Sequence, residues 1–116
     1  MIQFNKNTIY ECYDRMQTNG INSTLNYYRN ELKNVPDNVF LHIKSGYINL
    51  VKLLENIDNN CQDDDNLFEK VVGEGPIDNG EYWGIYVAYF PKGEYYKSMF
   101  NKLIEETPFG IQGKIK

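Results

Sequence analysis

The ten residues from Glu81 to Phe90, EYWGIYVAYF, decide the fold. Five of them are aromatic, and no charge follows the first residue. A β-strand sends alternate side chains to opposite faces. One face would hold Trp83, Ile85, Val87 and Tyr89. The other would hold Tyr82, Tyr86 and Phe90. A strand that is apolar on both faces is typical of a sheet centre covered on both sides, so we expect Trp83 to be buried between the sheet and a helix.

A β-hairpin is predicted immediately before and within this stretch. Residues 67–75 have the composition of a strand, and Asn79-Gly80 is a strong signal for a two-residue turn. Such a turn pairs residues whose numbers sum to 159, so that Gly73 faces Tyr86 and Gly75 faces Gly84. This glycine face either admits a helix at close range or forms a shallow groove beside the tyrosines.

Three helices are predicted before the hairpin. Thr8 and Glu11 fit a capping box that opens the first helix, which ends at Asn19-Gly20. The second begins at residue 22 or 23 and ends at Pro36. The third, from about residue 37 or 38 to about residue 57, carries an apolar stripe broad enough to lie across the sheet. Gly46 within it predicts close packing, because glycine costs a helix about 1 kcal/mol relative to alanine.

The C-terminal part predicts a further helix and strand. Pro91-Lys92-Gly93 forms a turn, residues 95–104 are amphipathic, and Thr107-Pro108 ends that helix. Residues 109–116 alternate like an edge strand. A right-handed βαβ crossover would place this strand parallel to the central one. The expected fold is a single α+β domain over residues 1–116, with three N-terminal helices, a hairpin and a βαβ tail. The strands of the hairpin and of the tail would form a small mixed three-stranded sheet.

Composition limits the cellular setting and the chemistry. With 116 residues and 15% aromatic content, the chain is long enough for one domain with a real core. Cys12 and Cys61 stand far apart without a metal-binding pattern, so both are expected to be free thiols. Neither a signal peptide nor a membrane span is predicted, and a cytoplasmic location is expected.

Charge is concentrated in one part of the chain. Residues 58–81 hold eight acidic side chains against the single base Lys70, a balance of −7 in a chain of net charge −4. This composition disfavours nucleic acid as a direct ligand and favours a basic protein partner. The residues expected to contact that partner are acidic, with two tyrosines as apolar anchors: Asp63, Asp64, Asp65, Glu74, Asp78, Glu81, Tyr82 and Tyr86.

No catalytic constellation, metal site or cofactor is predicted. His42 is the only histidine, and neither an acid nor a nucleophile can be assigned to it. The spacing from Asp58 to Glu69 faintly matches a calcium-binding EF-hand loop. However, Asp63 stands where that loop needs glycine, so a polar connector is the preferred interpretation.

Three functions are compatible with these features. The first is a small protein-binding module, an inhibitor or immunity-type protein that blocks a nuclease or other nucleic-acid-handling protein. Bacterial toxin-immunity proteins and inhibitors encoded by phages or mobile elements have this physical character. The second is an enzyme, since the strand order is similar to the core of acetyltransferases, although Pro91-Lys92-Gly93-Glu94 lacks their glycine-rich turn. The third is a small-ligand sensor that uses the Gly/Tyr face of the hairpin.

Overall fold

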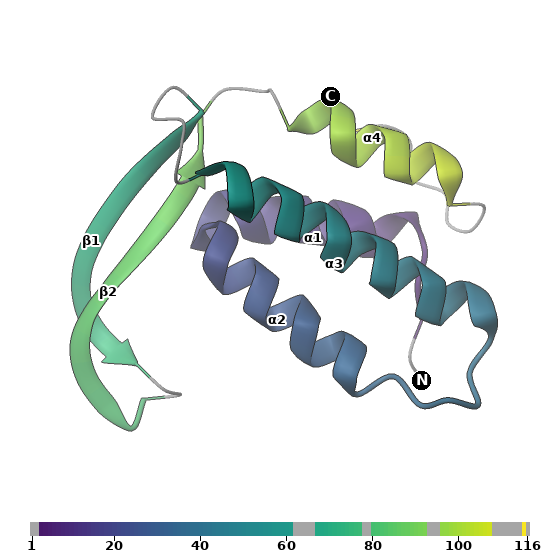
Figure 1. Cartoon of the computed structure of the whole chain (residues 1–116), viewed down its shortest axis with the longest axis horizontal. Coiled ribbons are helices and arrows are strands. Elements are labelled where there is room, and N and C mark those ends of the chain that lie inside the picture. Colours follow the sequence, from purple (N-terminus) through teal and green to yellow (C-terminus); the bar gives the residue numbers. More distant parts are fainter. Residues whose placement is uncertain (1–2, 62–66, 78–79, 93–95, 108–114, 116) are drawn as a thin grey trace.

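The protein consists of a helical bundle and a hairpin that curves away from one end of it (Figure 1). The computed structural model describes residues 3–61, 67–77, 80–92, 96–107 and 115. The elements in chain order are α1 (Lys6–Asn19), α2 (Ile21–Lys33), α3 (Leu41–Cys61), β1 (Phe68–Ile77), β2 (Tyr82–Pro91) and α4 (Lys97–Glu106). The predicted α+β class is confirmed.

The first helix starts earlier than predicted, because Asn5 and not Thr8 is its N-cap. The Asn5 side chain accepts hydrogen bonds from the amides of Asn7 (2.9 Å) and Thr8 (3.3 Å). The Thr8 hydroxyl accepts the Asn5 amide at 3.2 Å, which completes a capping box one turn before the predicted one. At the other end, Gly20 closes α1 and opens α2 with a φ of +89°, a conformation that favours glycine.

The third helix supplies much of the core, but it does not cover the sheet. Its apolar stripe is buried, and α3 packs mainly against α2. The prediction that this helix lies across the sheet is therefore wrong. The helix also begins at Leu41 and not at residue 37 or 38 as predicted, so Phe40 precedes it and is 74% exposed.

The hairpin has the predicted register. Val71 pairs with Ala88, Gly73 with Tyr86 and Gly75 with Gly84, all at a sum of 159. The Tyr86 ring lies across the glycines, so a Cβ added at Gly73 would approach it to 2.7 Å. The glycine face is thus filled by a tyrosine from the opposite strand, an arrangement known from other sheets in which an aromatic ring covers a glycine.

The burial expected for Trp83 is wrong: this side chain is 72% exposed. The described residues form a sheet of two strands, and beyond its buried base at Phe68 and Ala88 the hairpin extends away from the helices (Figure 1). The predicted third strand and the βαβ tail are not confirmed, since residues 108–114 and 116 lie outside the described residues. Ile115, which is described, pairs its backbone with the Asn101 side chain (2.6 and 3.1 Å).

The last helix anchors the base of the hairpin to the bundle. Tyr96 stands at its N-terminus and contacts Phe68 of β1, with ring centroids 5.2 Å apart. One turn later, Phe100 meets Tyr13 of α1 edge to face at 5.3 Å. These contacts join α4 to both parts of the fold.

Cys12 is a free, buried thiol, as predicted, and burial raises its pKa above the ordinary value. The side chain of Cys61 lies outside the described residues, so its state stays a prediction.

Gly46→Ala is expected to destabilise the protein, although alanine favours helices. An added Cβ would overlap the buried Phe4 ring, which packs directly on this glycine. Overpacking of this kind costs about 1 to 3 kcal/mol, which exceeds the helical gain of about 1 kcal/mol. Urea unfolding measures the change, with the exposed Asn49→Ala in the same helix as the control. A Gly46→Ala protein at least as stable as the parent would contradict the packing described here.

Candidate partner-binding surface

The predicted partner-binding residues fall into two groups. Glu74, Glu81, Tyr82 and Tyr86 lie exposed on the hairpin, but Glu74 pairs with Ile85 on the face opposite Tyr82 and Tyr86. Asp63, Asp64, Asp65 and Asp78 lie outside the described residues. The candidate surface is therefore defined by the hairpin and not by the loop before it.

One face of the hairpin, here called the tyrosine face, presents Tyr82 and Tyr86, which are 61% and 43% exposed. Between this face and the α1–α2 junction lies a groove of about 730 Å³. Its helical wall is polar and consists of Thr18, Asn19, Asn22, Ser23 and Asn26. Its opposite wall includes Tyr86 and Ala88, whereas the glycines of the hairpin do not line it, so the groove expected beside the glycines is not this one.

The opposite face, here called the Trp83 face, was not predicted to bind anything. Trp83, Ile85 and Val72 are 72%, 69% and 60% exposed. The register contained a signal for this outcome, because charged Glu74 pairs with Ile85 and Lys70 with Tyr89 on the same face. A core face rarely carries two charged residues at paired positions. Large adjoining apolar side chains on a surface mark interaction sites more often than isolated ones do.

Acidic side chains border both faces. Glu69, Glu74 and Glu81 are exposed on the described part of the hairpin, against the one base Lys70. The surface therefore combines aromatic and aliphatic contact area with negative charge.

The one histidine of the chain lies beside a small cavity. His42, Ser45 and Glu106 line a small cavity of about 160 Å³ between α3 and α4. His42 itself is exposed and stacks on Phe40, with ring centroids 5.8 Å apart. The described side chains include no group of three potential metal ligands.

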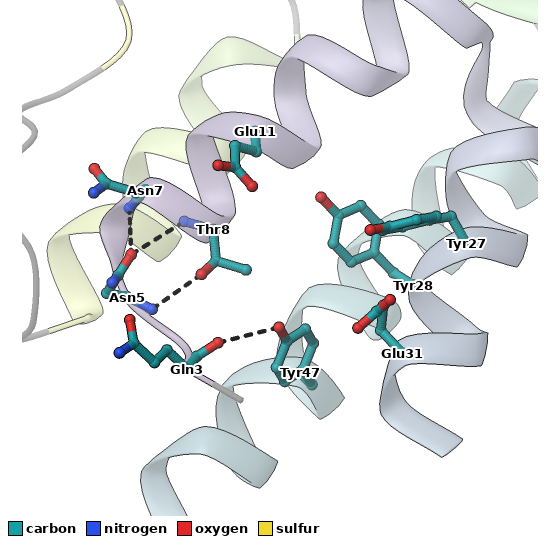
Figure 2. A pocket seen from close by; sticks show the side chains of 9 residues that line it. All are labelled: Gln3, Asn5, Asn7, Thr8, Glu11, Tyr27, Tyr28, Glu31 and Tyr47. Atoms are coloured by element: carbon teal, nitrogen blue, oxygen red, sulfur yellow. Dashed lines mark hydrogen bonds between the residues drawn. The ribbon is translucent and has the colours of Figure 1, made fainter. Parts of the chain in front are cut away.

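A second, polar cavity of about 310 Å³ lies where α1, α2 and α3 converge (Figure 2). Tyr28 and Glu31 of α2 face Glu11 of α1 across it, and Tyr47 of α3 closes the lower side. The Tyr47 hydroxyl donates a hydrogen bond to the Gln3 carbonyl at 3.1 Å. Burial raises the pKa of Tyr28 and of Tyr47, and for Tyr47 the negative charge of Glu31 adds to this effect.

These two tyrosines predict a loss of stability at alkaline pH. A phenol whose pKa is raised by folding stabilises the protein below its unfolded pKa of about 10, and this contribution is lost as pH rises toward the folded value. Between about pH 9 and pH 11, the parent should therefore lose more stability than the Tyr28→Phe/Tyr47→Phe variant does. Urea unfolding across this range gives the comparison. Equal losses would contradict the raised pKa values.

Neither a family model, a curated protein nor a solved structure matches this chain. None of the described helices combines the length and apolarity needed to cross a membrane. The candidate site therefore rests on the geometry and chemistry of the hairpin itself.

Proposed function

We propose that this protein is a small protein-binding module that inhibits a basic, nucleic-acid-handling partner such as a nuclease by covering its active surface. The observation that carries this proposal is the hairpin, whose large apolar side chains stay exposed on both faces beyond its base. Exposing Trp83 and Ile85 to water lowers solubility without adding stability. A partner that buries them would account for their presence.

Within this surface, apolar and acidic residues have different roles. Trp83, Ile85 and Tyr82 supply contact energy, because aromatic and aliphatic anchors in the centre of an interface usually dominate its affinity. Glu69, Glu74 and Glu81 attract and orient a basic partner before contact. Each exposed acid contributes only about 0 to 1 kcal/mol to affinity, so their combined effect falls mainly on the association rate.

The proposal is tested by capturing partners from extracts of the organism that encodes the chain, followed by association kinetics. Reversing Glu69, Glu74 and Glu81 to lysine should slow association with the captured protein at least tenfold at low salt. The matched control reverses three acids on the helices instead: Glu11, Asp14 and Glu106. Both variants change net charge equally, so only the location of the charge differs.

Equal association rates for the two variants would contradict a role for the hairpin acids. Salt provides a second check, because attraction between an acidic hairpin and a basic partner weakens as ionic strength rises. The parent should lose association rate between about 50 and 500 mM salt, while the hairpin variant should change little or in the opposite direction.

A ligand sensor is the second candidate, and the groove on the tyrosine face favours it. That groove is large enough for a small molecule, and its asparagine side chains can both donate and accept hydrogen bonds. A thermal-shift screen with nucleotides and acyl coenzymes tests this candidate together with the acyltransferase alternative. A ligand that raises the melting temperature of the parent, but not of an Asn26→Leu variant, would favour the sensor.

A further inference from the structure

The backbone of β2 has an outer edge, the side that does not pair with β1. The Lys92 amide donates to the Leu67 carbonyl at 2.6 Å, which extends the β1–β2 ladder by one pair. In an antiparallel ladder, the amide and carbonyl of one residue point to the same side, and the side alternates along the strand. Even-numbered residues of β2 therefore face β1. The outer edge consists of Trp83, Ile85, Val87 and Tyr89.

Part of this outer edge is already occupied by a side chain of α2. The Asn22 amide group donates to the Val87 carbonyl at 2.7 Å and accepts the Tyr89 amide at 3.5 Å. One asparagine thus satisfies two backbone groups in the way a neighbouring strand would. The bonds also confirm independently that odd-numbered residues point outward.

The outer edge of β1 is protected by a different device. By the same alternation, even-numbered residues of β1 face outward, and Pro76 is one of them. Proline has no amide to offer an added strand and is typical of edges that must not pair. Glu74, the next outward residue, adds a charge.

The outer edge of the segment from Trp83 to Val87 has no proline, and the Asn22 side chain reaches it only at the Val87 carbonyl. Its outward groups are the amides and carbonyls of Trp83 and Ile85 and the amide of Val87. No hydrogen bond from the described residues reaches these groups. Both the side chains and the backbone of this segment are therefore open to a partner.

We infer that the partner adds an extended segment to β2 along Trp83–Val87, as a third strand whose end meets Asn22. This inference rests on the proposed function and specifies how the partner binds. Strand addition obtains affinity from backbone hydrogen bonds and specificity from alternate side chains. Apolar side chains of the added strand would lie beside Trp83 and Ile85, and those between them would lie on the tyrosine face.

Charge selects a basic segment over a second copy of this chain. The tyrosine face offers exposed rings at Tyr82 and Tyr86, which attract lysine or arginine, and Glu81 directly precedes Tyr82. Glu69 adds a further negative charge opposite Phe90 at the base of the hairpin. Two copies paired along β2 would instead bring two acidic hairpins together, each from a chain of net charge −4. The occupant is thus an extended segment that alternates basic and apolar residues.

The experiment uses a short synthetic peptide of alternating lysine and valine, with a glutamate–valine peptide as its charge control. Ile85→Pro removes one outward amide and leaves the bonds to β1 in place, while Ile85→Ala removes the side chain but keeps the amide. We expect Ile85→Pro to bind the lysine peptide at least tenfold more weakly than Ile85→Ala does. The glutamate peptide should bind the parent at least tenfold more weakly than the lysine peptide.

A second measurement on the parent does not depend on whether the proline variant folds. The lysine peptide should slow amide hydrogen exchange of Ile85 and Val87 at least tenfold, with little change at Gly84 and Tyr86, which already bond to β1. The inference would be overturned if the two Ile85 variants bound the lysine peptide equally, or if the parent bound the two peptides equally. It would also be overturned if the amide of Ile85 gained no protection, or if the parent sedimented as a dimer formed through this edge. If Trp83→Ala then still abolished binding of the captured protein, the strand inference would fail while the proposed function stood.

Discussion

Replacing Phe100 with alanine is expected to lower the free energy of unfolding by about 3 to 5 kcal/mol. The ring of this α4 residue is fully buried and packs edge to face on Tyr13 of α1. Its loss would leave a cavity between these helices and weaken the element that holds the base of the hairpin. Because small domains have only about 5 to 15 kcal/mol of stability, much of the variant should be unfolded at moderate urea concentrations.

Trp83→Ala is the matched comparison, since it removes a still larger aromatic side chain. The structure predicts a change of less than about 1 kcal/mol, as for other exposed positions. Urea unfolding of the two variants and the parent under the same conditions decides between them. A Trp83→Ala variant as unstable as Phe100→Ala would show that the outer half of the hairpin belongs to the core.

The largest expected effect on function comes from the double variant Trp83→Ala/Ile85→Ala. Affinity for the captured partner should fall at least a hundredfold, which corresponds to about 2.7 kcal/mol. The melting temperature should stay close to that of the parent, because both side chains are mainly exposed. Calorimetric titration gives the affinity, and Val35→Ala, a buried position in the bundle, is the control for indirect effects on binding.

Local features of this fold were predictable from the sequence. The hairpin register followed from Asn79-Gly80, because a two-residue turn determines every pair that comes after it. The packing at Gly46 followed from the cost of glycine in a helix, and the structure identifies Phe4 as the side chain that fills the space. Such features depend on residues close together in the sequence or on simple periodicity.

The position of the hairpin relative to the helices was not predictable in the same way. An apolar strand indicates that something covers it, but not whether the cover belongs to the same chain. Trp83 and Ile85 are residue types that are usually buried in a core, but here both side chains are exposed, as in a binding surface. The sign that this face is exposed lies in the charged cross-strand partners of Ile85 and Tyr89. It becomes visible only once the register is applied to both strands.

The candidate site was predictable in its residue types but not in its arrangement. Acidic and tyrosine side chains could be assigned from the composition of residues 58–81 and of the strand after it. The open segment of β2 could not be assigned in this way, because Asn22 marks its end. Asn22 lies 65 positions away in the sequence from Val87, whose carbonyl it binds. Contacts over such sequence separations depend on how the helices pack, which no local pattern specifies.

Hydrogen–deuterium exchange of the protein with and without its captured partner tests the central claim most directly. If the hairpin is the binding surface, complex formation will slow exchange over residues 80–91, and most at the outward amides of Trp83, Ile85 and Val87. Exchange in α1, α2 and α3 around the polar cavity should remain as in the free protein. Protection confined to those helices, with the hairpin exchanging as before, would contradict the claim that this protein binds its partner through the hairpin.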